Sequence, residues 1–324
     1  MQKTIKMGIF HSTQTSFNPS TDIPSLKDKV ILITGANSGL GKQSLLELSR
    51  HEPRYIWLAS RSTSKAHELI SEMKDQGYNH QIIKPIELDL SSLNSILRAA
   101  RQIREQTSQL DILILNAGIM AVPPGVTENG YEIQFGTNYL GHAFLVRRLL
   151  PLLVGTAQQH GPESDVRIVL VSSTAYRYAP SCGIDFSSLT KSHIKGMNTV
   201  ARYGQSKLAV NLYGQELSKR YRALKVVIVH PGQVRTNLGD AASSSSLLMK
   251  VLWKLTSALN GVDPETGVLN QLWAATSDAV LSGKYYDPVG VINQDIEHTE
   301  QPELATKLWE WTEQQLSRFE ESMG

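Results

Sequence analysis

Short, uninterrupted runs of apolar residues recur along the first 230 residues of the chain. They occupy residues 30–33, 55–58, 82–83 leading to Ile86, 112–115, 166–171 and 226–229. Because these runs do not alternate with polar positions, they are typical of strands that are covered on both faces, as in a parallel sheet.

Longer stretches with helical periodicity separate the apolar runs. They lie near residues 40–51, 63–77, 91–107, 132–153 and 203–222. A seventh strand is expected at 284–286, after a helical stretch near 264–277. Strands that alternate with helices in this way predict an α/β fold of the Rossmann type, a doubly wound parallel sheet of about seven strands with helices on both faces.

The pattern predicts a single domain of the Rossmann type over 29–324, preceded by a loose polar arm at 1–28 and closed by a C-terminal helix within 300–324. The region 240–262 is an addition to the sheet, and its segment 247–255 is apolar around much of a helix. This segment follows the sixth strand at the edge where ligands bind, so it is either a substrate lid or a plainly packed helix.

Composition excludes several classes of protein. The 32 basic and 30 acidic side chains give a net charge of only +2 without a basic run, which argues against a nucleic-acid partner. Cys182 is the only cysteine, so neither an internal disulfide nor a CxxC metal site can form, and no metal is expected. No stretch approaches the ~20 apolar residues of a membrane helix. We therefore expect a soluble, cytoplasmic protein without an integral membrane segment.

A glycine-rich turn follows the first predicted strand and opens the first helix, in the order Thr34-Gly35-Ala36-Asn37-Ser38-Gly39-Leu40-Gly41. Glycines let the backbone turn tightly and approach a pyrophosphate, whose charge then meets free amides at the helix N-terminus. Its place between strand and helix therefore indicates a dinucleotide site.

Further motifs follow in a fixed order, and together they make the chain resemble the short-chain dehydrogenase/reductase family. They are Asp89-Leu90, Asn116-Ala117-Gly118, Asn138, Ser172-Ser173, Tyr203-x-x-x-Lys207 and Pro231-Gly232-x-Val234-x-Thr236. Taken singly, Asn116 could be an ordinary strand exit and Asp89 a helix cap. The resemblance covers about 28–240, and an insert at 176–200 is similar to those of retinol-dehydrogenase-like members.

The resemblance implies a nicotinamide cofactor. Its expected contacts are Gly35, Ser38, Gly39, Leu40, Gly41, Lys42, Arg61, Asp89, Asn116, Arg148, Tyr203, Lys207, Val234 and Thr236. An acid after the second strand would bind the ribose hydroxyl of NAD, but this chain has Arg61 there and no Asp or Glu between Ser60 and Ala66. An arginine suits a 2′-phosphate, so NADP is expected.

Tyr203 and Lys207 are the predicted acid–base pair. A tyrosine has an ordinary pKa of about 10, and a nearby ammonium would lower it. Spacing of four places both side chains on one helix face. The same spacing recurs at Tyr221 and Lys225, but Lys225 opens a strand, so that second pair is expected to be coincidental.

The resemblance also implies roles for two further residues. Ser173 would bind the substrate oxygen and position Tyr203, and Asn138 would support a water that leads protons to Lys207. The expected reaction interconverts a carbonyl and an alcohol, and the apolar 247–255 segment favours a bulky apolar substrate such as one met in secondary metabolism.

Two other functions and the oligomeric state stay open at this point. A sugar-nucleotide epimerase or dehydratase relative would usually show Gly-x-x-Gly-x-x-Gly, which is absent. A non-catalytic NADP sensor often lacks the tyrosine, lysine or serine, which are all present. Family members form dimers or tetramers through the helices near 132–153 and 203–222, or remain monomers.

Overall fold

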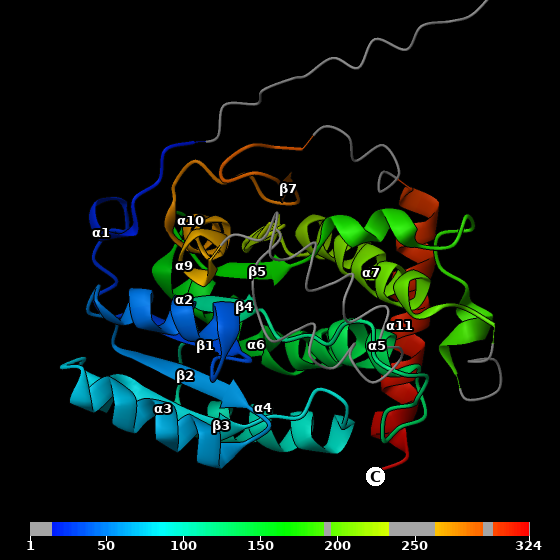
Figure 1. Cartoon of the computed structure of the whole chain (residues 1–324), viewed down its shortest axis with the longest axis horizontal. Coiled ribbons are helices and arrows are strands. Elements are labelled where there is room, and N and C mark those ends of the chain that lie inside the picture. The colour runs from blue at the N-terminus through cyan, green and yellow to red at the C-terminus, as the bar shows by residue number, and fades with distance from the viewer. Residues whose placement is uncertain (1–14, 191–195, 233–262, 294–300, 324) are drawn as a thin grey trace, which may run out of the picture.

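The computed structural model describes residues 15–190, 196–232, 263–293 and 301–323. At its centre lies a sheet of seven parallel strands in the order β3-β2-β1-β4-β5-β6-β7 (Figure 1). The strands are β1 (Val30–Thr34), β2 (Tyr55–Ser60), β3 (Ile83–Glu87), β4 (Ile112–Leu115), β5 (Arg167–Val171), β6 (Lys225–Val229) and β7 (Tyr285–Tyr286). This sheet confirms the predicted doubly wound α/β fold. Its strand order reverses between β1 and β4, and ligands bind at such a point.

Helices cover both faces of the sheet. They are α2 (Gly39–Ser49), α3 (Thr63–Asp75), α4 (Leu93–Gln106), α6 (Gly141–His160), α7 (Thr199–Arg220), α9 (Pro264–Gly267) and α10 (Leu269–Thr276). Successive strand residues point to opposite faces. Ile31 and Ile33 therefore pack with α2, α3 and α10, whereas Val30 and Leu32 pack with α4, α6 and α7. The central strands β1, β2 and β4 are buried on both faces, which explains their apolar runs.

The segment that leads into α6 is continuous with it. It consists of α5 (Ile133–Phe135) and the π-helical turn η2 (Gly136–Leu140). By length and composition alone, Ile133–His160 is the one helix among the described residues that could cross a membrane. However, 61% of its apolar 18-residue stretch is buried inside the protein. Its burial is that of a core helix.

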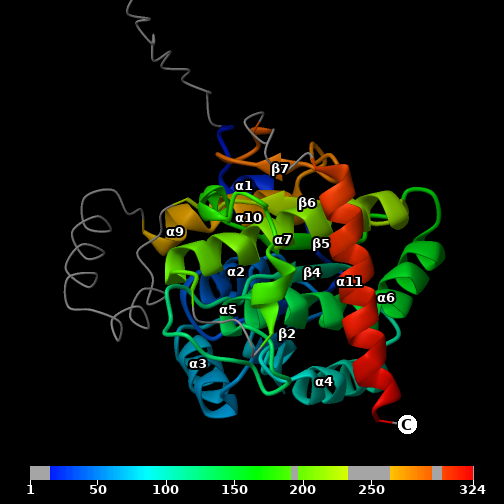
Figure 2. The same ribbon diagram turned by 90° about the vertical axis from the view of Figure 1, so that its right-hand side faces the viewer.

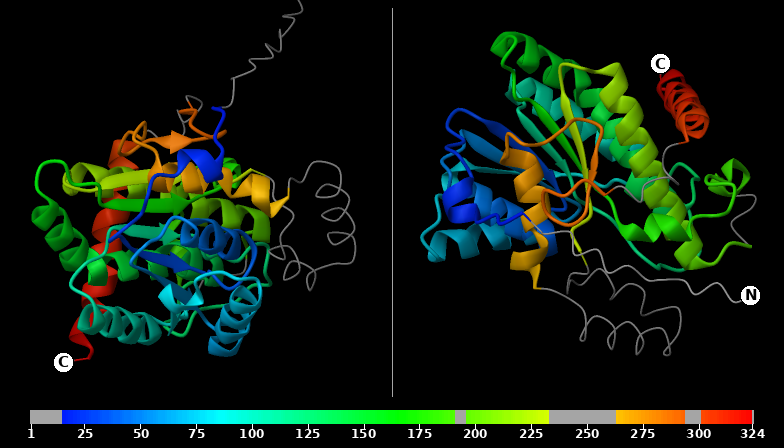
Figure 3. Two further views of the ribbon diagram at one scale, coloured as in Figure 1. Left: turned by 90° about the vertical axis from the view of Figure 1, so that its left-hand side faces the viewer. Right: turned by 90° about the horizontal axis from the view of Figure 1, so that it is seen from above.

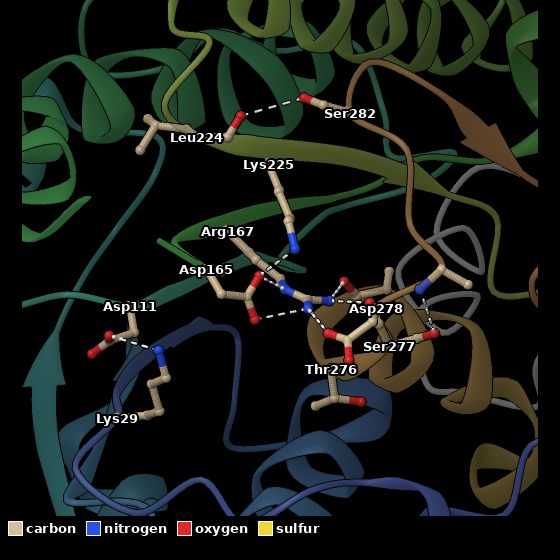
Figure 4. Close-up of polar contacts among 12 residues, drawn as sticks. Lys29, Asp111, Asp165, Arg167, Leu224, Lys225, Thr276, Ser277, Asp278 and Ser282 are labelled. Carbon is tan, nitrogen blue, oxygen red and sulfur yellow. Dashed lines mark hydrogen bonds and ion pairs between the residues drawn. The ribbon is translucent and has the colours of Figure 1, made fainter. Parts of the chain in front are cut away.

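Hydrogen bonds and an ion pair connect the segments at the amino ends of the strands. Arg167 is fully buried at the start of β5, where its guanidinium forms a two-pronged ion pair with Asp165 at 2.7 and 2.8 Å (Figure 4). The same guanidinium donates to the carbonyl oxygens of Ala274 and Ser277. Arg167 therefore fixes the end of α10 to the central sheet.

Part of the N-terminal arm packs on the domain, contrary to the expectation of a loose arm. Ile23 and Leu26 are 5% and 4% exposed, and a short helix, α1 (Pro19–Asp22), precedes them. The amide of Thr15 donates to the Val289 carbonyl. The two buried apolar side chains anchor 15–28, and the earlier residues lie outside the described part of the chain.

The C-terminal helix α11 (Pro302–Glu321) lies across α6 and α7 (Figures 2 and 3). Trp309 stacks on Tyr213 of α7 with ring centroids 5.3 Å apart, and Phe319 meets Phe144 of α6 edge to face. Thr312 and Tyr139 share a buried hydrogen bond of 2.6 Å. The chain's own C-terminal helix thus covers the two helices that the resemblance offered as a dimer interface.

Candidate active site

The glycine-rich turn connects the carboxyl end of β1 to the N-terminus of α2. Gly35 and Gly39 adopt φ of +69° and +54°, which side-chain-bearing residues rarely adopt. At Gly41 space decides, because a Cβ there would overlap the Gly35 carbonyl and lie 2.7 Å from Asn116 Nδ2. Glycine is therefore required at all three positions for different reasons.

The turn leaves the first amides of α2 without a side-chain cap. Ser38 occupies the N-cap position, but its hydroxyl makes no capping hydrogen bond. The first amides of a helix have no intrahelical partner, so those of Gly39, Leu40 and Gly41 can donate to an anion. The turn and these amides form a cradle that a larger side chain would fill, and it fits a dinucleotide.

Asn116 and Thr34 hold the back of this cradle. Asn116 Nδ2 donates to the Thr34 carbonyl at 2.9 Å, and the Thr34 hydroxyl accepts the amides of Asn116 and Ala117 at 2.9 and 3.0 Å. The ends of β1 and β4 are thereby joined. Sequence reasoning selected Asn116 but missed Thr34, whose partners lie more than 80 residues away.

Three predicted cofactor contacts surround the turn, in different environments. Arg61 follows β2 directly and is exposed, and within the described part of the chain it makes no ion pair. Lys42 Nζ pairs with Glu72 at 2.6 Å on the surface. Asp89 Oδ1 accepts the amide and the hydroxyl of Ser91, so this carboxylate stabilises a turn, whereas Ser92 caps α4. Arg61 is thus available for a ligand, whereas Lys42 would have to leave Glu72.

Asn138 lies in the π-helical turn and connects three segments of the site. Its Oδ1 accepts the Ile119 amide at 2.8 Å, and its Nδ2 donates to the Ile119 carbonyl and to Ser206 Oγ of α7. Gly118 leaves room for this contact, since a Cβ there would lie 3.3 Å from Asn138 Oδ1. π-turns occur often at functional sites, because the extra residue redirects side chains.

Tyr203 and Lys207 lie one helical turn apart on α7, and both are almost fully buried. Lys207 Nζ lies 5.8 Å from the Tyr203 ring centroid and donates to the Val171 carbonyl at 2.9 Å. Ser173 follows β5 and interacts with the Tyr203 hydroxyl, whereas the Ser172 hydroxyl donates to the Lys207 carbonyl. The structure therefore brings Ser173, Tyr203 and Lys207 together at the carboxyl edge, next to Asn138.

Burial dominates the acid–base properties of the pair. It raises the pKa of Tyr203 to about 12, against a smaller lowering by the hydrogen bond with Ser173. Burial also lowers the pKa of Lys207 to about 8. The lowering of the tyrosine pKa by the lysine stays a prediction, and in this structure the Lys207 amine donates to the Val171 carbonyl. Tyr203 thus keeps its proton at neutral pH.

Arg148 is a prediction that the structure corrects. Its guanidinium pairs with Glu320 of α11 at 2.8 Å, away from the site. Ten residues of helix separate it from Asn138, which amounts to about 15 Å along the axis. Val234, Thr236 and the region 240–262 lie outside the described residues.

A buried ion pair beside the site escaped sequence reasoning. Arg202, which precedes Tyr203, donates to Glu132 at 2.8 Å, and the two side chains are 3% and 1% exposed. Arg202 also donates to the Val122 carbonyl. A buried Arg next to Tyr203 carries no local sequence signal, because its partner lies 70 residues earlier.

Comparisons with known proteins agree with this arrangement. The family model of short chain dehydrogenases matches residues 29–246. An uncharacterized oxidoreductase of Schizosaccharomyces pombe is 39% identical over 83% of this chain and 79% of its own length. Human retinol dehydrogenase 13 is 36% identical over 88% and 83%, respectively. The crystal structure of an uncharacterized protein from Mycobacterium paratuberculosis superposes with a TM-score of 0.69 at 30% identity, covering 94% of this chain and 98% of that one.

Proposed function

The chain belongs to the short-chain dehydrogenase/reductase family, in its retinol-dehydrogenase-like branch, and from this premise we propose that it reduces a carbonyl on a bulky apolar substrate with NADPH. The observation that carries the proposal is the meeting of Ser173, Tyr203, Lys207 and Asn138 beside the glycine turn. The bound nicotinamide would supply the hydride. The chain's own residues would hold the substrate oxygen and provide the proton.

Tyr203 is the proposed general acid. Because burial keeps its pKa well above neutral, the hydroxyl is protonated and able to neutralise the alkoxide that carbonyl reduction leaves. In the reverse direction the same oxygen would accept the proton of the alcohol, so both directions would use this one group. The protonated hydroxyl is the form that reduction uses.

Ser173, Lys207 and Asn138 have supporting roles in the proposal. Ser173 lies beside the Tyr203 hydroxyl and would hold the substrate oxygen there. Lys207 would bind the nicotinamide ribose and place positive charge near the tyrosine. Asn138 binds both Ile119 and Ser206, so it would hold the segment after β4 at a fixed position relative to α7.

The cofactor preference rests on Arg61. The cradle of Gly35, Ser38, Gly39, Leu40 and Gly41 fits the pyrophosphate of either nucleotide. Arg61, exposed at the end of β2, would add a paired contact to a 2′-phosphate, which only NADPH carries.

Substitution of Tyr203 tests the proposal. NADPH oxidation is followed at 340 nm with a panel of ketones and aldehydes. Tyr203→Phe removes only the proton-donating oxygen, so NADPH binding should persist while turnover falls by at least about a hundredfold.

Tyr221 provides the matched control. It ends α7, and Lys225 begins β6, so this second Tyr–Lys pair does not share a helix face. Tyr221→Phe should stay within a few fold of wild type. Near-normal reduction by Tyr203→Phe, or a folded but inactive Tyr221→Phe, would contradict the assignment.

A further inference from the structure

His142 is a buried histidine next to the candidate site that the proposed reaction does not use. It lies in the first turn of α6, one helical turn after Asn138, and is 5% exposed. Nδ1 lies 2.9 Å from the Asn138 carbonyl oxygen, and Nε2 lies 2.9 Å from the Thr34 hydroxyl. The imidazole therefore bridges the end of β1 and the π-helical turn.

The hydrogen bonds around His142 define its tautomer. A carbonyl oxygen only accepts, so Nδ1 must carry a proton and donate to Asn138. The Thr34 hydroxyl already accepts two amides, so its proton is its remaining contribution. That proton goes to Nε2, since the other acceptor within reach, the Ile114 carbonyl, lies at 3.5 Å.

The same assignment of donors and acceptors requires that the His142 ring is neutral. A proton on Nε2 would face an oxygen whose two lone pairs are already occupied. Burial, with a smaller contribution from the nearby Lys207 charge, lowers the pKa of His142 to about 4. Geometry and electrostatics thus agree on a neutral imidazole at physiological pH.

The bridge joins two parts of the site. On one side, the Thr34 hydroxyl holds the Asn116 and Ala117 amides behind the glycine turn. On the other, Asn138 holds Ser206 of α7, whose hydroxyl donates to the Tyr203 carbonyl. We propose that His142 is a positioning residue that links the nucleotide cradle to the catalytic helix through this Thr34–His142–Asn138 chain of hydrogen bonds.

Three substitutions at His142 separate the two ends of the bridge. His142→Asn keeps a donor near the Nδ1 position, so it retains the bond to Asn138 and loses the one to Thr34. His142→Gln keeps an acceptor near the Nε2 position and does the reverse. His142→Leu fills similar space without either bond, and His160→Asn, at the exposed end of the same helix, is the control.

The expected result is a split between NADPH affinity and turnover. His142→Asn should weaken NADPH binding about tenfold and keep kcat within a few fold, because a buried group left unpaired costs about that factor. His142→Gln should keep the NADPH affinity and lose about tenfold in kcat. His142→Leu should lose both, and His160→Asn neither.

Thr34→Val provides a second measurement on the same bond. It removes the hydroxyl from the other side, together with its contacts to the Asn116 and Ala117 amides, so the double variant with His142→Asn should bind NADPH no more weakly than Thr34→Val alone. Fully additive effects, or losses that follow only the thermal stability of the variants, would reduce His142 to a packing residue and overturn the inference.

The inference rests on the proposed function only for its turnover readout. A wild-type protein that binds NADPH but reduces none of the carbonyls would overturn the proposed reaction alone. The Thr34–His142 cycle in NADPH affinity would still decide the positioning role.

Discussion

The buried ion pair between Glu132 and Arg202 allows a quantitative prediction. Glu132 Oε1 accepts from Arg202 at 2.8 Å, and Oε2 accepts the Phe135 amide at 2.7 Å. Glu132→Gln has almost the same shape but leaves the Arg202 charge buried without its counter-ion. Such a loss typically costs about 3–5 kcal/mol of unfolding free energy.

This cost translates into a measurable shift in the unfolding temperature. An unfolding entropy of about 2.1 cal/mol/K per residue gives roughly 0.7 kcal/mol per degree for 324 residues. Glu132→Gln should therefore lower the Tm by roughly 4–7 °C in a circular-dichroism melt. Turnover should fall as well, because Arg202 adjoins Tyr203.

Two comparisons show whether burial is the cause. Glu105 pairs with Arg101 on the surface, where the side chains are 60% and 80% exposed, so Glu105→Gln should shift the Tm by less than about 1 °C. A double variant, Glu132→Leu with Arg202→Met, removes both charges and should recover most of the loss. A Glu132→Gln protein that melts within a degree of wild type would refute the reasoning.

Three further predictions concern the cradle and the buried lysine. Arg61→Ala should weaken NADPH binding much more than NADH binding in fluorescence titrations, and equal wild-type affinity for the two would argue against the NADP assignment. Gly41→Ala should weaken NADPH binding at least about tenfold, because its Cβ would overlap the Gly35 carbonyl. Gly155→Ala is the control: its Cβ would have no atom within 4 Å, so this variant should melt no lower than wild type. Burial lowers the pKa of Lys207 from 10.5 to about 8. Burying the charged amine therefore lowers the unfolding free energy of the nucleotide-free protein, fully below pH 8 and progressively less as the pH rises toward 10.5. In urea unfolding, Lys207→Met should thus gain stability over wild type at pH 7, and the gain should shrink by pH 10; a gain that does not depend on pH would exclude titration as its cause.

Sequence reasoning succeeded where one local signal sufficed. The runs at 30–33 and 112–115 were identified as strands because each is apolar on both faces, and both became central strands. Gly35 and Gly41 were selected because the turn stands between a strand and a helix, and the structure supplies a conformational reason for one and a spatial reason for the other.

It failed where a side chain's role depends on a distant partner. Arg148 was assigned to the cofactor, but α11 supplies Glu320 to it from 172 residues away. Thr34 and His142 bind each other across 108 residues, although the spacing of four between Asn138 and His142 was a visible hint. The hydrogen bond from Lys207 to the Val171 carbonyl, 36 residues earlier, is likewise a contact that no local sequence pattern reports.

The position of α11 affects how this protein can be divided. Its side chains cover a surface on η2, α6 and α7 that would otherwise expose Tyr139, Phe144 and Tyr213. A chain that stops before Pro302 would expose this apolar surface to solvent, and we expect it to self-associate or precipitate. The helix α11 thus covers this apolar surface from within the same chain, and a separate peptide with the sequence of α11 should bind to the surface that the truncation exposes.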